Sequence, residues 1–302
     1  MMQKRSFSIS ESGQNEESTD CRENERLDVG LQLSKTPYLS YLAHSTKNSE
    51  TYLLKIFIHP DSSTINPLYT REARFLSFEH PNLVSILDVR PNYSLLNNGK
   101  RIRASYIITE KPKYGNFYNL IMHGHLPDDD VLNRTFFHQL IDGIEFIHSQ
   151  GIAHMHLRPE NIFLDTGYTL KIANFNYSQT PKEVSVVTHG HHNYLAPEAH
   201  HRINDNPMAA DIYSAGLFLF IMRTRTFPYM VKEFNALFWK AFQKNYKSSE
   251  SCGDFGELCE KMLANDPNAR PTLKEIRKSK WFLGPTYSKK ELENILADYL
   301  SS

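Results

Sequence analysis

The stretch His154-Met-His-Leu-Arg-Pro-Glu-Asn161 is the part of the sequence from which the fold can be worked out. Before it, residues 130–150 carry apolar side chains at three- and four-residue steps, which predicts one long amphipathic helix. After it, residues 161–164 and 170–172 are two short β-favouring runs. The eight residues are therefore predicted to form a loop that connects a long helix to a pair of strands.

Six further motifs occur in a fixed order around this loop. They are Lys55 with Glu72, His80-Pro-Asn-Leu-Val84, Asn174-Phe-Asn176, Tyr194-Leu-Ala-Pro-Glu198, Asp211-Ile-Tyr-Ser-Ala-Gly216 and Asp266-Pro-Asn-Ala-Arg-Pro271. In this order the series resembles the protein kinase family, whose catalytic loop reads H-R-D-L-K-P-E-N and whose later motifs read D-F-G and A-P-E. The resemblance covers residues 30–283 and is to the Ser/Thr branch, because of the Pro-Glu-Asn sequence and Thr188-x-Gly190.

The resemblance implies an α+β, bilobal protein-kinase-like fold. A small lobe of antiparallel β-sheet with one helix is expected over residues 27–111, and a larger, mainly helical lobe over 112–283. The residue pattern agrees with this order. Strand-like runs at 38–43, 52–58 and 105–109 surround one predicted helix at 67–79, and the pattern after residue 120 is mostly helical.

Two terminal segments lie outside the expected domain. Residues 1–26 are polar and acidic without a hydrophobic period, which predicts a disordered tail. Residues 284–302 are predicted to contain an amphipathic helix that begins at a capping box, Ser288 with Glu291. Its apolar stripe is Leu292, Ile295, Leu296 and Tyr299. We expect this stripe to pack on the chain's own domain, and docking to a partner is the alternative.

Composition excludes several classes of function. The 302 residues carry 34 Lys+Arg and 34 Asp+Glu, a net charge of zero that argues against nucleic-acid binding through phosphates. The longest apolar stretch, 215–222, is too short to span a membrane, and the first residues lack the apolar core of a signal peptide. Cys21, Cys252 and Cys259 show neither a disulfide framework nor metal-binding spacing. We expect a cytoplasmic protein, with the nucleus as the alternative.

Two carboxylates that the kinase reaction needs are absent. By resemblance, Asn174 stands where the D-F-G aspartate would bind Mg²⁺, a cation that prefers carboxylate ligands. His156 stands where the catalytic-loop aspartate would accept the proton of the substrate hydroxyl. A neutral imidazole can accept a proton. The loss of both carboxylates together nevertheless predicts that phosphoryl transfer is nearly abolished.

The expected nucleotide pocket is also altered. The glycines of the G-x-G-x-x-G loop are replaced by Leu33, Lys35 and Tyr38, although glycine is what lets a backbone approach phosphates closely. Leu53 replaces a small alanine that lies over the adenine ring in the family. In the segment Thr109–Pro112, which includes Glu110, Pro112 has no N–H to donate to adenine.

Other positions of the family pattern remain. By resemblance, Lys55, Glu72, Glu110 and Asn161 are the candidate nucleotide-binding residues, Asn161 with Asn174 the candidate metal ligands, and His156 with Arg158 the candidate catalytic positions. Asp211 would brace the catalytic loop, and Glu198 with Arg270 would form a buried ion pair. His154 and Phe175, with Leu76 and Ile86, would belong to a hydrophobic column.

These observations favour a pseudokinase that acts as a scaffold or allosteric regulator through protein binding. Its expected partners are proteins, among them an active kinase or that kinase's substrate, and neither nucleic acid nor membrane. The alternatives are a divergent Ser/Thr kinase of low activity and an ATP sensor that does not transfer phosphate. No cofactor is required by the first interpretation, and ATP with Mg²⁺ at low affinity is required by the alternatives.

Overall fold

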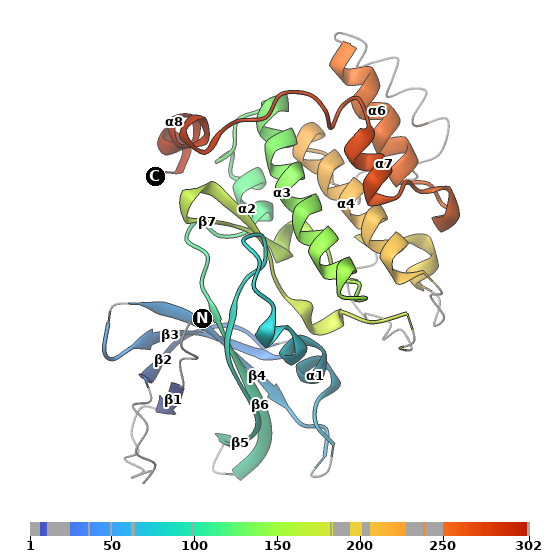
Figure 1. Cartoon of the computed structure of the whole chain (residues 1–302). Coiled ribbons are helices and arrows are strands. Elements are labelled where there is room, and N and C mark those ends of the chain that lie inside the picture. Colours follow the sequence, from blue (N-terminus) through green and yellow to red (C-terminus); the bar gives the residue numbers. More distant parts are fainter. Residues whose placement is uncertain are drawn as a thin grey trace. The chain divides into compact units, whose positions relative to one another are not determined.

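The computed structural model describes residues 7–10, 25–35, 37–48, 50–61, 64–97, 100–181, 183, 194–200, 206–227, 238 and 250–300. The chain folds into two compact units (Figure 1). The first comprises Met1–Glu79 and Val84–Lys111, and the second comprises His80–Leu83 and Pro112–Ser302. The first is built on a β-sheet, and the second is mainly helical, as expected for a bilobal kinase-like fold.

The sheet of the first unit has six strands in the order β1-β2-β3-β4-β6-β5. Their bounds are Phe7–Ser10, Glu25–Ser34, Leu39–Ser45, Thr51–Ile58, Lys100–Glu110 and Ile86–Asn97, in that order. All neighbouring strands pair antiparallel except β1 and β2, which pair parallel. The register shifts at Arg90/Tyr93 in β5, where Pro91 cannot donate to a ladder.

Side chains of strand β4 point alternately to the two faces of the sheet, so the apolar core lies on one face and Lys55 on the other. Leu54 and Ile56 are buried with Tyr106 and Ile108 of β6 in one core cluster. Because successive side chains of a strand point to opposite faces, Lys55 and Phe57 lie on the other face. Helix α1, Pro67–Ala73, contacts Lys55 and Phe57 on this face through Glu72 and Tyr69. The strand pattern thus positions Lys55 beside the helix.

Helix α1 is shorter than the predicted helix 67–79. It begins after Asn66, whose side chain accepts a hydrogen bond from Leu68 N at 2.9 Å, and a 3-10 turn, Arg74–Ser77, follows it.

The prediction of a disordered tail over residues 1–26 needs a correction. Phe7–Ser10 form β1, and β2 begins at Glu25, because pairing between strands supplies order that the local sequence does not. The rest of 1–24 lies outside the described residues.

The second unit contains helices α2 (Phe117–Met122), α3 (Asp130–Ser149), α4 (Pro207–Thr224), α6 (Glu250–Met262), α7 (Leu273–Lys278) and α8 (Lys289–Leu300). The hairpin of β7 (Ile162–Asp165) and β8 (Thr169–Ile172) follows the loop after α3. Helix α4 lies against both α3 and α6 (Figure 1). Its residues from Ala209 to Met222 are all buried, as expected for a central helix that is apolar on every side.

Helix α8 packs on its own unit, as the sequence predicted. Ser288 Oγ and the Glu291 carboxylate bond at 2.7 Å in the predicted capping box. Leu292 and Leu296 are buried, whereas Tyr299 is 42% exposed. The segment before the helix is held by Arg134, whose guanidinium donates to Trp281 O and Pro285 O. None of the helices in the described part of the chain has the length and hydropathy of a membrane span.

Candidate functional site

Asp211 fixes the loop that was predicted to be the catalytic loop. This buried carboxylate on α4 accepts the backbone N–H of His154 at 2.7 Å and that of Met155 at 2.8 Å. Met155 has a φ of 60°, a left-handed conformation that is uncommon for a residue other than glycine. The two hydrogen bonds stabilise this conformation. His148 Nε2 lies 2.9 Å from the same carboxylate, a contact that no motif indicated.

The orientation of His154 is set by two hydrogen bonds within this unit. Its Nδ1 accepts the backbone N–H of His156 at 3.1 Å, so the proton lies on Nε2, which donates to Ala173 O at 3.0 Å. The imidazole is therefore neutral. Its ring packs edge-on against Phe175, with centroids 5.2 Å apart, and both residues are buried. This contact links the loop to the segment that starts at Asn174.

The two candidate metal ligands bond to each other. Asn174 Nδ2 donates to Asn161 Oδ1 at 2.6 Å, and Asn161 Nδ2 donates to His156 O at 2.8 Å. Asn174 has a φ of 65°, a left-handed conformation that asparagine tolerates better than most side chains. The place of the missing carboxylate is thus taken by an amide pair that is already hydrogen-bonded.

This donor set does not fit Mg²⁺. The ion favours charged oxygen ligands in near-octahedral geometry, and it leaves its bound water reluctantly. Asn161 and Asn174 together offer neutral amides, and Asn161 Oδ1 already accepts a hydrogen bond. A cation would have to displace that bond without gaining a negative charge.

The candidate catalytic residues are held by neighbours from their own unit. The His156 ring lies edge-on to Tyr177, with centroids 4.7 Å apart and planes at 80°. Arg158 makes a two-pronged ion pair with Glu160, in which Nε donates to Oε2 at 2.8 Å and Nη2 donates to Oε1. Its guanidinium also lies 5.1 Å from the centre of the Tyr194 ring. The positive charge retained at this position is compensated inside the protein.

Lys55 and Glu72 form a buried ion pair in the first unit. Lys55 Nζ on β4 lies 2.5 Å from Glu72 Oε1 on α1, and the two side chains are 6% and 1% exposed. Burial alone would lower the pKa of Lys55, but the Glu72 carboxylate and Tyr38 together outweigh it, and the pKa is raised. Lys55 is therefore held in its charged form by groups of its own unit.

Glu110, the third candidate for nucleotide binding in this unit, joins strand β6 to the segment before β5. Its carboxylate accepts the backbone N–H of Ser85 at 2.8 Å, and its own N–H donates to Ser85 O at 3.1 Å. The side chain thus organises the chain before β5. The side chain bridges two backbone segments, and the nucleotide contact suggested by the sequence stays a prediction.

The predicted ion pair between Glu198 and Arg270 is present in the second unit. Both nitrogens Nη1 and Nη2 of Arg270 donate to the Glu198 carboxylate, at 2.5 and 2.7 Å. Arg270 also donates to Ala209 O and Ala264 O, each at 2.9 Å, and stacks on Tyr213 at 4.9 Å. This arginine connects three parts of the helical unit, which is a structural role.

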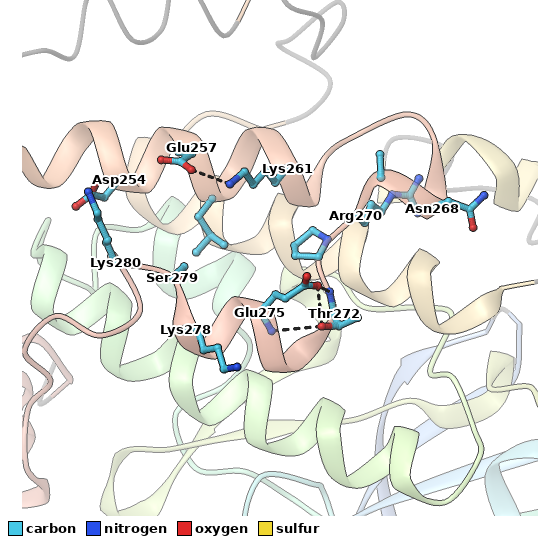
Figure 2. A pocket seen from close by; sticks show the side chains of 13 residues that line it. Asp254, Glu257, Lys261, Asn268, Arg270, Thr272, Glu275, Lys278, Ser279 and Lys280 are labelled. Atoms are coloured by element: carbon cyan, nitrogen blue, oxygen red, sulfur yellow. Dashed lines mark hydrogen bonds and ion pairs between the residues drawn. The ribbon is translucent and has the colours of Figure 1, made fainter.

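Two hollows lie next to Arg270 on the surface of this unit. One, of about 660 Å³, is formed by α6, α7 and the turn before α7, and is lined by charges of both signs (Figure 2). Glu257 and Lys261 pair across one helix turn at 2.7 Å, and Glu275 caps α7 through Thr272. The second, of about 610 Å³, has apolar lining from Met208, Ile212 and Leu273. Nothing in the motifs pointed to either hollow.

The Thr188-x-Gly190 segment lies outside the described residues, as do the neighbouring His189, His191 and His192. The candidate residues that are described divide into two groups. Lys55, Glu72 and Glu110 belong to the first unit, and the structure brings His154, His156, Arg158, Asn161, Asn174, Phe175 and Asp211 together in the second.

Comparisons with known proteins agree with the fold. A sheet unit with a Lys–Glu pair, followed by a helical unit with a braced loop, defines the bilobal kinase class. The chain matches the protein kinase domain over residues 39–282, and it belongs to that family.

Three of its relatives are named as protein kinases. CBL-interacting serine/threonine-protein kinase 8 of Arabidopsis thaliana is 33% identical over 256 residues, which cover 80% of this chain and 54% of that protein. CBL-interacting protein kinase 26 of Oryza sativa subsp. japonica is 28% identical over 269 residues, 85% of this chain and 52% of that protein. Probable serine/threonine-protein kinase KCC4 of Saccharomyces cerevisiae is 32% identical over 205 residues, 65% of this chain and 19% of that protein. The chain spans about half the length of the two plant relatives.

Proposed function

We propose that this chain is a pseudokinase domain that acts by binding other proteins, as a scaffold or allosteric regulator. The observation that carries the proposal is the hydrogen bond between Asn174 and Asn161, which takes the place of a metal-binding carboxylate. Kinase catalysis consists almost entirely of positioning and of neutralising charge with metal ions. A domain that keeps the fold without that metal site has its surface as its remaining means of action.

The second change, His156, strengthens the proposal. The loss of a general base typically costs about 10²–10⁴-fold in rate. The loss of a metal ligand adds to this, although effects within one catalytic unit do not simply multiply. Edge-on packing against Tyr177 gives the His156 ring a role in holding the loop.

Two hollows on the surface and the names of two relatives support the proposal that the partners are proteins. The hollow of mixed charge beside α6 and α7 (Figure 2) and the apolar hollow beside α4 supply polar and apolar contacts close together. Two relatives are named as CBL-interacting kinases, and we extend only the capacity to bind a protein to this chain. An active kinase, or the substrate of one, is the partner class we propose, in the cytoplasm or alternatively the nucleus.

One observation favours a second candidate function. The ion pair of Lys55 with Glu72 is intact, as it would be in a divergent Ser/Thr kinase of low activity or in an ATP sensor. Transfer of labelled phosphate from ATP, to the chain itself and to a general protein substrate, separates these functions. We expect no incorporation above that of a heat-denatured control. Incorporation that Lys55→Met abolishes would contradict the pseudokinase proposal.

A further inference from the structure

The turn before β3 places an aromatic ring on the charged lysine of the first unit. The ring centre of Tyr38 lies 5.3 Å from Lys55 Nζ, within the distance of about 6 Å at which a cation is attracted to a ring face. The same ammonium contacts the Glu72 carboxylate at 2.5 Å. Two elements, the turn and helix α1, thus supply a π face and a negative charge to one cation.

The ring of Tyr38 is held in place by a row of aromatic side chains. Its centre lies 4.9 Å from that of Phe57, and Phe57 in turn meets Tyr69 of α1 edge-on at 5.9 Å. Phe57 and Lys55 share one face of β4, so the row runs beside the ion pair. Phe57 and Tyr69 are buried, and their packing supports the half-buried ring of Tyr38. Aromatic contacts of this kind stabilise the rings beyond the effect of their burial.

Tyr38 occupies a sequence position at which the contact with Lys55 would affect phosphate binding. By resemblance, it is the third glycine position of the phosphate-binding loop, which is left without a side chain in the family so that phosphate can approach. Here the side chain at this position points to the lysine that would otherwise contact phosphate. Lys55 is 5% exposed, so an anion cannot reach it without moving a neighbouring group.

We propose that Tyr38 is an internal cover that closes Lys55 to polyphosphate ligands, and that removing its ring opens an anion site on this lysine. The proposal rests on the pseudokinase function and deepens it, because it names one residue that separates this chain from a nucleotide-binding relative. It concerns the phosphate-binding position alone. The adenine position, with Leu53 and Pro112, is a separate obstacle.

Inorganic triphosphate is the appropriate probe, because it carries the phosphate charge without the adenine ring. Its binding to the full chain is measured by calorimetry and by the shift in thermal unfolding, which rises with the ratio of ligand to dissociation constant. We expect Tyr38→Ala to bind triphosphate at least about tenfold more tightly than the wild type, the factor that corresponds to losing a buried cation–π contact. Lys55→Met in the Tyr38→Ala background is expected to remove this binding.

Tyr38→Phe is the matched control. It keeps the ring and its contact with Phe57 but loses the hydroxyl, which also interacts with Lys55, so it is expected to bind triphosphate less tightly than Tyr38→Ala does. Tyr38→Gly restores the family's residue and serves as a second opening variant if Tyr38→Ala is unstable. Acetylation of Lys55 by an amine-reactive ester, followed by peptide mass spectrometry, reports its accessibility independently of ligand binding. Greater acetylation is expected in both opening variants.

Two results would overturn the inference. One is a folded Tyr38→Ala or Tyr38→Gly variant that binds triphosphate no more tightly than the wild type. The other is a Tyr38→Phe variant that binds as tightly as Tyr38→Ala, because then the ring does not provide the cover. Failure of the proposed function gives a different result, since it would show as ATP binding and phosphate transfer by the wild-type chain.

Discussion

Asp211 and Asn174 both organise the loop of residues 154–161, and they do so with different chemistry. Asp211 is a buried carboxylate that accepts two backbone N–H groups and positions His154 and Met155. Asn174 is an amide that bonds to the amide of Asn161. The carboxylate of Asp211, which binds the backbone, is present in this unit. At Asn174, where the family has a metal-binding carboxylate, there is a neutral amide. The proposed function rests on this separation of the fold from the chemistry of a kinase.

The first prediction, with the largest effect, concerns Arg270. Arg270→Ala leaves the Glu198 carboxylate without its bidentate partner and removes the hydrogen bonds to the carbonyls of Ala209, Ala264 and Asn265. Breaking one side of a buried ion pair typically costs about 3–5 kcal/mol in the free energy of unfolding. Urea denaturation followed by fluorescence measures the loss.

Arg277→Ala is the control for this change. Arg277 also pairs with two carboxylates of the same unit, Asp142 and Glu145, but they are 46% and 47% exposed. Exposed pairs contribute about 0–1 kcal/mol. Equal losses for the two variants would show that burial does not distinguish these ion pairs, against the structural role given to Arg270.

The second prediction tests the brace itself. Asp211→Ala removes the acceptor of two backbone hydrogen bonds and of the contact with His148. A hydrogen bond to a charged group contributes about 1.5–3 kcal/mol. Because bonds to one carboxylate are not additive, we expect a total loss of about 2–4 kcal/mol in the free energy of unfolding. Asp211→Asn keeps one acceptor oxygen and should lose less. Chemical denaturation of both variants measures the difference, and an unchanged midpoint for Asp211→Ala would contradict the brace.

The sequence alone predicted those helices whose start or apolar period is encoded by neighbouring residues. The period of residues 130–150 predicted α3 to within one residue, and the capping box at Ser288 predicted the start of α8. Strand β1 was missed, because it depends on pairing between residues 7–10 and 25–28, which no local pattern encodes.

The sequence predicted which residues belong to the candidate site, but it did not predict which side chains they contact. Motif order identified Lys55, Asn161 and Asn174. That Tyr38 lies over Lys55, that Tyr177 packs on His156, and that Glu160 neutralises Arg158 depend on side-chain directions in three dimensions. An aromatic residue at a loop position where the family has glycine was the one available signal for the first of these contacts.

The third prediction restores the missing charge. Asn174→Asp keeps a residue that tolerates the left-handed backbone but removes the donor to Asn161 Oδ1, so it should cost about 1 kcal/mol without metal. Millimolar Mg²⁺ is expected to recover part of this loss in the variant and to leave the wild type unchanged. Differential scanning calorimetry with and without Mg²⁺ measures both effects. Equal stabilisation of the wild type by Mg²⁺ would mean that the amide pair does bind the ion.

The fourth prediction concerns pH and has the smallest effect. His59 is buried, and its Nε2 lies 2.7 Å from Ser105 Oγ, which itself donates to Pro91 O. Burial and the charge of Arg103 lower the pKa of His59, against an opposing effect of Asp61.

A lowered folded-state pKa means that the native protein prefers neutral His59. This stabilisation is complete above the unfolded-state value of about 6.5 and decreases as the pH falls through the folded-state pKa, by at most about 1.4 kcal/mol per pH unit. His59→Gln should lose this part of the dependence. Unfolding midpoints at pH 7.5, 6.5 and 5.5 for the wild type and the variant provide the test. If the midpoints of both proteins change equally with pH, His59 does not contribute to the pH dependence.

We propose that the fold of a kinase is present here without its nucleotide and metal chemistry. Calorimetric titration of the wild-type chain with ATP, in the presence and absence of Mg²⁺, tests it most directly. We predict no saturable heat up to millimolar ATP in either condition, because Tyr38 covers Lys55 and the amides of Asn161 and Asn174 bond to each other. A one-to-one isotherm that requires Mg²⁺ and disappears in Lys55→Met would contradict the claim.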